Sequence, residues 1–215
     1  MTSTNYSVKV VNNGAAAWQF YVYQKPPAVA NNLSLAWFAS PYHIGVGDSI
    51  TFSWNIQYSF VWSATGIVKP GIQFTASGVK ECDPDGENIT SFTFENNTPN
   101  LSYPATGGTG GSLTIKDGDS VPSNTFAVGV GMSGKGTYVV NAGPNLTHEF
   151  TPEPKYYIVA ADEVVEGQVM DITTVTKSGS LAFSPQCVRS DRDTESRQYS
   201  GTLKPALKPR TSFDF

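Results

Sequence analysis

Residues 50–62 read ITFSWNIQYSFVW, and every even-numbered position carries a large apolar side chain. Successive side chains of a β-strand point to opposite faces, so this alternation places five aromatic rings on one face and a mostly polar set on the other. At about 3.3 Å per residue the stretch would be roughly 40 Å long, which exceeds an ordinary strand. We therefore predict a bend, a bulge or a crossing from one sheet to another within it.

The rest of the chain has the composition of an all-β protein. Glycine (20 residues) and proline (14) are frequent, and charged residues make up only 15% of the sequence. These values are typical of many short strands joined by turns. Residues 72–76 are expected to form one further strand, and residues 126–130 and 137–140 to form a hairpin around Gly134 and Gly136.

We expect an antiparallel β-sandwich, with a flattened barrel as the alternative. The sandwich is assigned to a single domain over residues 1–185, because strand-like patterns continue to about that point. Residues 186–215 are polar and mixed in charge. They are expected to form an irregular tail that is extended or disordered.

Charge and hydropathy argue against two classes of partner. The formal net charge is −4, whereas proteins that bind a phosphate backbone cluster Lys and Arg. No apolar run approaches the roughly 20 residues that cross a bilayer, and the start of the chain lacks a basic segment followed by an apolar one. We expect no nucleic-acid partner, no membrane association and no signal peptide, and hence a cytoplasmic or non-classically exported protein. The sequence does not indicate an oligomeric state.

The chain has two cysteines, Cys82 and Cys187. Without a signal peptide, two free thiols are the favoured interpretation, and a single disulfide bridge between them is the alternative. Only His43 and His148 supply imidazoles, and no Cys/His cluster has the spacing of metal ligands. We therefore predict no metal site.

No motif in the sequence supports catalysis. Residues 129–136 match the glycine pattern of nucleotide-binding loops, but residues 137–140 are β-branched or aromatic where such a loop needs a helix. Residues 83–88 place acidic oxygens at alternate positions, as calcium loops do, but the distal glutamate is missing and an ordinary turn is favoured. The sequence therefore predicts a protein that is not an enzyme.

The aromatic residues supply the predicted binding site. Packing in a hydrophobic core is the simplest role for such rings. The alternative role is a wall along a slot for an elongated apolar ligand, with Tyr hydroxyls and Trp N–H groups as its few polar contacts. Two glycines would leave a strand face bare, which permits the close approach of a ring. The candidate ligand-binding residues are Trp37, Tyr42, Trp54, Tyr58, Phe60, Trp62, Gly129 and Gly131.

Five short motifs are distinctive: NNG at 12–14, VYQ at 22–24, LAWFA at 35–39, YSFVW at 58–62 and GVGMSG at 129–134. Together they resemble the RhiA-like family of small bacterial and fungal proteins, over about residues 5–184 as judged from where the strands run. The resemblance brings no catalytic activity that could be transferred. It implies kinship with fungal pink chromoproteins that hold a polyene pigment noncovalently.

The resemblance and the aromatic residues together predict a binding protein for an elongated hydrophobic small molecule. The cofactor that the resemblance implies is a noncovalent polyene chromophore of the conjugated carboxylic acid type. Its carboxylate would need a cation, for which the candidates are Lys69, Lys135, Lys155 and His43. Two alternatives stay open, namely a carbohydrate-binding module or lectin and a structural or storage protein without a ligand.

Overall fold

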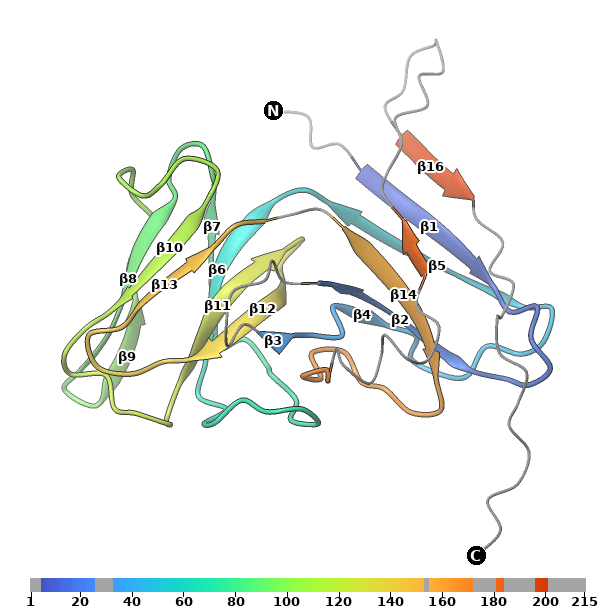
Figure 1. Cartoon of the computed structure of the whole chain (residues 1–215), viewed down its shortest axis with the longest axis horizontal. Coiled ribbons are helices and arrows are strands. Elements are labelled where there is room, and N and C mark those ends of the chain that lie inside the picture. The colour runs from blue at the N-terminus through green and yellow to red at the C-terminus, as the bar shows by residue number, and fades with distance from the viewer. Residues whose placement is uncertain (1–4, 26–32, 153–154, 172–180, 184–195, 201–215) are drawn as a thin grey trace, which may run out of the picture.

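The computed structural model describes residues 5–25, 33–152, 155–171, 181–183 and 196–200 (Figure 1). These residues form strands, turns and loops, and no helix occurs among them. The strands are β1 (Asn5–Val11), β2 (Gln19–Gln24), β3 (Leu33–Ser34), β4 (Phe38–Ala39), β5 (Ser49–Asn55), β6 (Tyr58–Ser63), β7 (Gly78–Cys82), β8 (Ile89–Glu95), β9 (Thr98–Leu101), β10 (Leu113–Asp117), β11 (Ala127–Met132), β12 (Lys135–Asn141), β13 (Thr147–Phe150), β14 (Tyr156–Ala161), β15 (Leu181–Phe183) and β16 (Ser196–Ser200).

The described strands form four open sheets, each named here after one of its strands. Their strand orders are β16-β1-β5 (the β1 sheet), β15-β14-β2-β4 (the β2 sheet), β13-β10-β8-β9 (the β8 sheet) and β3-β12-β11-β6-β7 (the β11 sheet). Most neighbours are antiparallel, and the pairs β1–β16 and β8–β10 are parallel. None of these sheets closes on itself. The all-β fold is confirmed, in its sandwich form and not as a flattened barrel.

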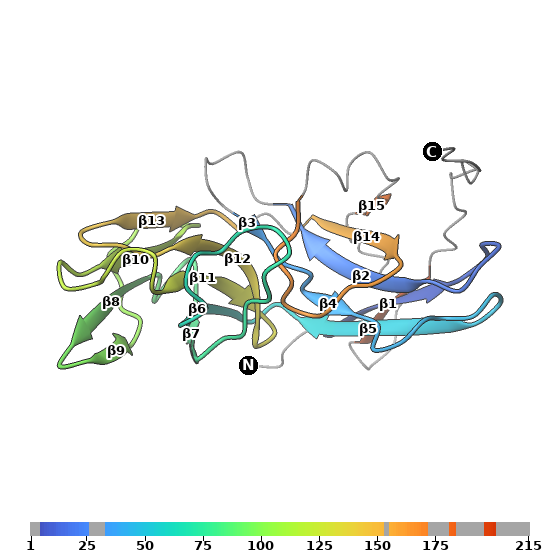
Figure 2. The same ribbon diagram turned by 90° about the horizontal axis from the view of Figure 1, so that it is seen from below.

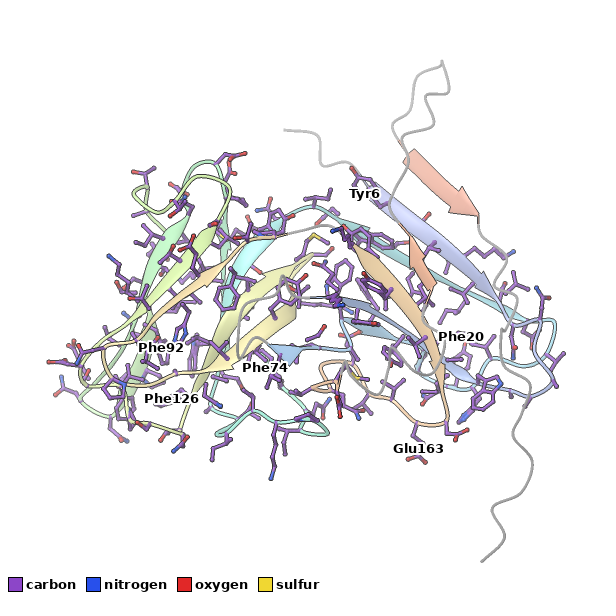
Figure 3. The ribbon with its side chains drawn as sticks, in the orientation of Figure 1. Tyr6, Phe20, Phe74, Phe92, Phe126 and Glu163 are labelled. Atoms are coloured by element: carbon purple, nitrogen blue, oxygen red, sulfur yellow. The ribbon has the colours of Figure 1, made fainter. Side chains whose placement is uncertain are left out.

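The sheets pack in pairs around two main cores, which lie side by side along the molecule (Figures 1 and 2). The first core lies between the β8 and β11 sheets and contains Phe60, Phe92, Phe126 and Val130. The second core lies between the β1 and β2 sheets and contains residues such as Phe20. Figure 3 shows Phe92 and Phe126 together at one end of the molecule and Phe20 toward the other.

The crossing predicted within residues 50–62 lies at Ile56 and Gln57. β5 belongs to the β1 sheet and β6 belongs to the β11 sheet, so the chain passes from one sandwich to the other between them. Figure 1 shows β5 and β6 following each other across the top of the molecule. The even-numbered residues keep their alternation on either side of the break, and therefore they enter two different cores.

The predicted hairpin is formed by β11 and β12. Met132 pairs with Lys135, so the connection has two residues, Ser133 and Gly134. Their φ angles are 56° and 77°. Two successive positive φ angles are characteristic of the tight turn that matches the twist of a β-hairpin, and glycine at the second position adopts this conformation without strain.

The strand expected at residues 72–76 is wrong. Gln73 forms only an isolated bridge, with Gln168, and the backbone N–H of Phe74 donates to the carbonyl of Gly167 at 2.9 Å. The Phe74 ring is buried in a third cluster, on the outer face of the β11 sheet. The apolar residues of this segment therefore reflect a loop that packs over a sheet, which a short apolar run does not distinguish from a strand.

Part of the predicted tail belongs to a sheet. β16 lies within residues 186–215 and pairs with β1 in parallel, with Asn5 opposite Ser196. The single-domain boundary at residue 185 stays a prediction. The described part of the chain contains no helix of the length and apolarity needed to span a membrane.

Candidate functional site

The predicted aromatic wall is divided between the two cores. Trp54 lies in the second core, Phe60 lies in the first, and Trp62 is half-buried against the first. Tyr58 is half-buried and packs against both cores. These residues therefore do not line one continuous slot. Trp54 and Tyr58 lie on either side of the point where β5 passes into β6, at the junction of the two sandwiches.

Trp37 and Trp54 belong to a packed group of rings beside this junction, which we call the junction cluster: Trp37, Phe38, Phe52, Trp54 and Tyr156. The ring centroids of Trp37 and Trp54 are 5.6 Å apart, and Tyr156 lies 4.9 Å from Trp54 and 5.8 Å from Trp37. These separations are typical of aromatic rings in direct contact.

One further ring borders the cluster on the side of β1. Tyr6 is stacked on Trp54 with centroids 6.3 Å apart and the planes inclined by 17°. Tyr6 is only half-buried, whereas both tryptophans of the cluster are buried. Tyr6 is the cross-strand neighbour of Trp54 in the β1 sheet, and it is the more exposed of the two rings.

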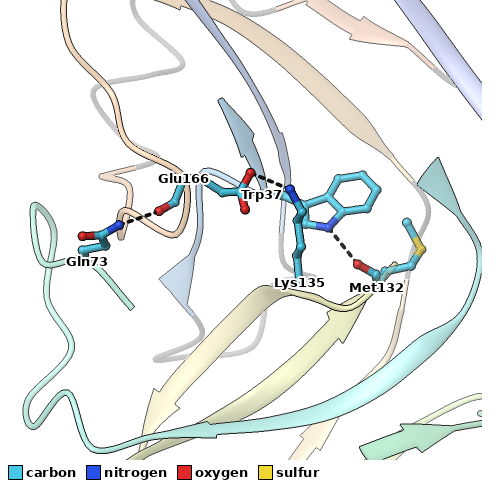
Figure 4. A network of polar contacts seen from close by, with 5 residues as sticks. All are labelled: Trp37, Gln73, Met132, Lys135 and Glu166. Carbon is cyan, nitrogen blue, oxygen red and sulfur yellow. Dashed lines mark hydrogen bonds and ion pairs between the residues drawn. The ribbon is translucent and has the colours of Figure 1, made fainter. Parts of the chain in front are cut away.

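The two tryptophan N–H groups of the cluster differ in their hydrogen bonding. Nε1 of Trp37 donates to the carbonyl oxygen of Met132 at 2.9 Å (Figure 4). Nε1 of Trp54 is buried and has no acceptor among the described residues. Such a group is uncommon, because most buried polar atoms in native proteins are hydrogen-bonded to protein or to ordered water.

The turn between β11 and β12 attaches the first sandwich to this cluster. Besides the bond from Trp37, Oγ of Ser133 accepts a hydrogen bond from the backbone N–H of Asn55 at 3.2 Å. Lys135 Nζ lies 4.3 Å from the centroid of the Phe38 ring and forms an ion pair of 2.6 Å with Glu166 (Figure 4). Among the four predicted cation candidates, the structure places Lys135 in contact with the junction cluster.

Burial affects the ionisation of Tyr58 in this region. Its pKa is raised, first by desolvation and then by the nearby Cys82 and Tyr6. Cys82 belongs to the first core, whereas Tyr6 packs against the second. The hydroxyl of Tyr58 is therefore neutral at physiological pH and could offer a hydrogen bond at the junction without introducing a charge.

Gly129 and Gly131 are approached by protein backbone. A Cβ atom at Gly129 would lie 2.0 Å from the carbonyl oxygen of Tyr138, and one at Gly131 would lie 2.3 Å from the carbonyl oxygen of Lys135. Both oxygens belong to β12, the neighbouring strand. The close approach expected at these glycines is thus made by the β-ladder itself, so β11 requires glycine there for its pairing.

Tyr42 lies apart from the other candidates, in the loop between β4 and β5. Its side chain is 66% exposed. It borders a surface hollow of about 380 Å³ that is lined by Tyr42, His43, Ile44, Gly45, Gly47, Asp48 and Ser49. The structure therefore divides the predicted residues among the two cores, the β11–β12 ladder and one exposed tyrosine.

Comparison with known proteins assigns the family. The RhiA family model matches residues 3–198. The chain belongs to the RhiA family. It is also 51% identical over 181 residues to Protein RhiA of Rhizobium leguminosarum bv. viciae, and the match covers 84% of this chain and 78% of that protein. No solved structure matches the chain.

The RhiA match extends further than the motifs indicated. It runs past residue 184 to residue 198 and so includes the first three residues of β16. The parallel pairing of β16 with β1 provides a structural reason, because this strand extends the β1 sheet. β16, which lies within the presumed tail, therefore belongs to the β1 sheet, and the family match reaches into it.

A polar pair in this RhiA-family chain, formed by the buried Asp117 and the partly buried His148, gave no signal in the sequence. Nε2 of His148 lies 2.9 Å from Oδ2 of Asp117, and the same oxygen accepts the backbone N–H of Gly143 at 3.0 Å. Oδ1 of Asp117 has no partner among the described residues. The two side chains are 31 positions apart and are brought together by the antiparallel pairing of β10 with β13.

The acidic segment at residues 83–88 forms a turn in this member of the family. Oδ1 of Asp83 accepts the backbone N–H of Asp85 at 3.0 Å, and the N–H of Gly86 donates to the Asp83 carbonyl at 3.0 Å. This is the local arrangement by which Asp residues stabilise turns. Among the described residues, no three His, Cys, Asp or Glu side chains are grouped so that they could hold a metal ion.

Cys82 is a free thiol in the first core. Burial, followed by the charge of Asp83, raises its pKa from 9.0 to about 12. The thiol is therefore protonated and unreactive in the folded protein, because the thiolate is the nucleophilic form. Cys187 lies outside the described residues.

Proposed function

We propose that this RhiA-family protein is a binding protein without catalytic activity, and that it holds an elongated hydrophobic molecule noncovalently at the junction cluster. The ligand class that we favour is a conjugated polyene with a carboxylate at one end. The observation that carries the proposal is the Trp54 indole N–H, which is buried among aromatic rings and has no acceptor in the described part of the chain.

An unpaired buried N–H group costs about 1–3 kcal/mol of stability. Phe at the same position would avoid this cost. Trp37, in contact with Trp54, has its N–H satisfied by a carbonyl oxygen. A polar atom of a ligand would satisfy Trp54 in the same way, while the surrounding rings would contact the conjugated chain. Binding sites for small molecules commonly combine an apolar lining with a few such polar groups.

The edge of Trp54 beside Tyr6 is the proposed entry for the ligand, because Tyr6 is its more exposed cross-strand neighbour. Tyr6 and Trp54 are nearly parallel, which is the arrangement that accommodates a flat conjugated chain once Tyr6 moves aside. Tyr6 is half-buried and lies on β1, the strand between β5 and β16. We propose that Tyr6 is displaced by the ligand, because Tyr6 is half-buried whereas Trp37 and Trp54 are buried.

Lys135 is the cation that we assign to the carboxylate of the ligand. It lies against Phe38 of the junction cluster, whereas its partner Glu166 is a partly exposed side chain of a loop. An exposed ion pair of this kind contributes at most about 1 kcal/mol. A ligand carboxylate could therefore replace Glu166 at little cost.

The test uses the full-length protein purified from its native source, with its visible absorption spectrum and mass spectrometry of an organic extract. We expect a visible band and an extractable conjugated molecule. Trp54→Phe, produced in the same host, should stay folded and lose the pigment. Trp62→Phe is the matched control, because Trp62 is a half-buried ring of the first core, and this variant should keep the pigment.

A colourless protein with an empty extract would contradict the proposal and would favour a structural or storage role. Equal loss of pigment in both variants, with the fold retained, would also contradict it. That outcome would show that the pigment does not depend on the junction cluster in particular.

A further inference from the structure

We propose a second ligand site, separate from the junction cluster, that binds a neutral sugar. The site is the surface hollow of about 380 Å³ in the loop between β4 and β5. It depends on no part of the proposed pigment site, because its lining residues contribute no ring to the junction cluster. Three observations support it: a hydrogen-bonded loop, an exposed aromatic ring, and polar side chains without partners among the described residues.

The loop is held rigidly by a buried asparagine. Nδ2 of Asn12 donates to the carbonyl of Ile44 at 2.8 Å, and its backbone N–H donates to the carbonyl of Asp48 at 2.9 Å. The N–H of Gly47 donates to the carbonyl of Asn12 at 2.8 Å. Ile44 is itself buried in the second core. A site on such a fixed backbone loses little conformational entropy when a ligand binds.

The side chains around the hollow are available for binding. Tyr42 is 66% exposed, and among the described residues no hydrogen bond or ion pair is made by the side chains of Tyr42, His43 or Asp48. The Asp48 carboxylate bends back over Gly45, where a Cβ atom would lie only 2.6 Å from Oδ2. The glycine therefore leaves room for the carboxylate at the edge of the hollow.

The chemistry of these groups selects a polyhydroxylated neutral molecule. A Tyr ring offers an apolar face for the C–H groups of a sugar. A carboxylate accepts hydrogen bonds from two hydroxyls, and the imidazole of His43 offers two ring nitrogens for hydrogen bonds. Tyr42, His43 and Asp48 thus provide the combination of flat apolar contact and directed hydrogen bonds that a pyranose requires.

Other ligand classes fit this hollow less well. Asp48 repels anions, and the hollow has only one buried apolar side chain, Ile44, for an extended hydrophobic molecule. A single carboxylate and a single imidazole are too few ligands for a metal ion. Calcium takes about six to eight oxygen ligands, and zinc takes about four ligands. A nucleic acid is disfavoured by the same carboxylate and by the net charge of −4.

The experiment measures sugar binding to the full-length protein. Glucose, galactose, mannose, arabinose and N-acetylglucosamine are each tested by saturation-transfer NMR, and binders are titrated by calorimetry. A second arm tests retention on insoluble plant and microbial polysaccharides. We expect weak binding, with a Kd of about 1 mM, for at least one sugar. Binding to polymers but not to monosaccharides would also support the site and would identify a polysaccharide as the source.

Two variants locate the binding site. Tyr42→Ala and Asp48→Asn should each weaken binding by about tenfold or more, which corresponds to about 1.4 kcal/mol. Tyr103→Ala is the matched control, because Tyr103 is 81% exposed and lies in the loop that follows β9, in the other sandwich. All three positions are on the surface, so the variants should fold, which circular dichroism would verify.

The proposal is overturned if no sugar or polysaccharide binds. It is also overturned if Tyr42→Ala binds as well as the unchanged protein, or if Tyr103→Ala loses binding to the same extent. The pigment proposal has a separate readout, the visible spectrum, which these variants should leave unchanged. Failure of one proposal is therefore distinguishable from failure of the other.

Discussion

Replacing Trp37 and Trp54 separately with Phe should have clearly different effects on stability. Both side chains are buried, with 1% and 3% exposed, and they are in contact in the same cluster. Each substitution removes an indole N–H and leaves a cavity of similar size. The cavity contributions therefore largely cancel when the two variants are compared.

The hydrogen bonds do not cancel. Trp37→Phe loses the bond to the Met132 carbonyl, at a cost of about 1 kcal/mol. Trp54→Phe removes an N–H that has no acceptor among the described residues, which recovers about 1 kcal/mol or more. In the ligand-free protein, Trp37→Phe should therefore be less stable than Trp54→Phe by about 2 kcal/mol, or about 4–8 °C in Tm for a chain of this size.

Urea denaturation of ligand-free protein, followed by circular dichroism, measures this difference, provided that both variants keep the same dependence on urea concentration. Equal destabilisation by the two substitutions would refute the reasoning, because it would mean that the N–H of Trp54 has a partner in the folded protein. In pigment-loaded protein the difference in stability between the two variants should be smaller or of opposite sign, since Trp54→Phe would then lose a ligand contact as well.

Three further predictions concern packing and ionisation. Gly129→Ala should cost about 3 kcal/mol or prevent folding, since its Cβ would collide with the backbone of β12. The control is Gly110→Ala, which should be neutral because no atom lies within 4 Å of the added Cβ. Equal changes in Tm for the two variants would count against this packing at Gly129. Asp117→Ala should cost about 3 kcal/mol in urea denaturation, because it leaves His148 and a buried backbone N–H without their acceptor; a loss below about 1 kcal/mol would contradict the assigned pair. Burial raises the Cys82 pKa from 9.0 to about 12, so the thiol loses its proton at a lower pH in the unfolded chain than in the folded protein. The contribution of this thiol to folding stability is therefore fully present below pH 9 and is lost as the pH rises toward 12. The difference in stability between pH 8 and pH 10 should be smaller in Cys82→Ala than in the unchanged protein, and an unaltered pH dependence would show that the thiol does not contribute.

Local sequence pattern was sufficient for the parts of the fold that depend on local geometry. The alternation of residues 50–62 required a break because of its length, and the break occurs at Ile56 and Gln57. Gly134 marked the hairpin turn because few residues other than glycine readily adopt its positive φ. Both inferences needed only strand periodicity and backbone sterics.

The candidate site depended on long-range packing, which periodicity does not specify. Alternation placed Trp54 and Phe60 on one face, but it could not show that the face is shared between two cores once the strand crosses between sheets. Tyr156 was missed for a related reason. It lies 119 positions after Trp37 in the sequence and joins the cluster only because β14 pairs with β2 in the opposite sheet.

The junction explains why the two sandwiches should behave as one unit. β5 and β6 follow each other in the chain but contribute side chains to different cores. The single strand β11 contributes to both cores, because Val130 lies in the first core and Met132 lies in the second. Tyr58 packs against both. Separating the sandwiches would therefore expose parts of two cores at once.

A ligand at the junction cluster would stabilise both sandwiches together, because it binds only where both are folded. A sugar in the loop between β4 and β5 would contact the second sandwich alone, so its effect on the first would be transmitted only through this junction.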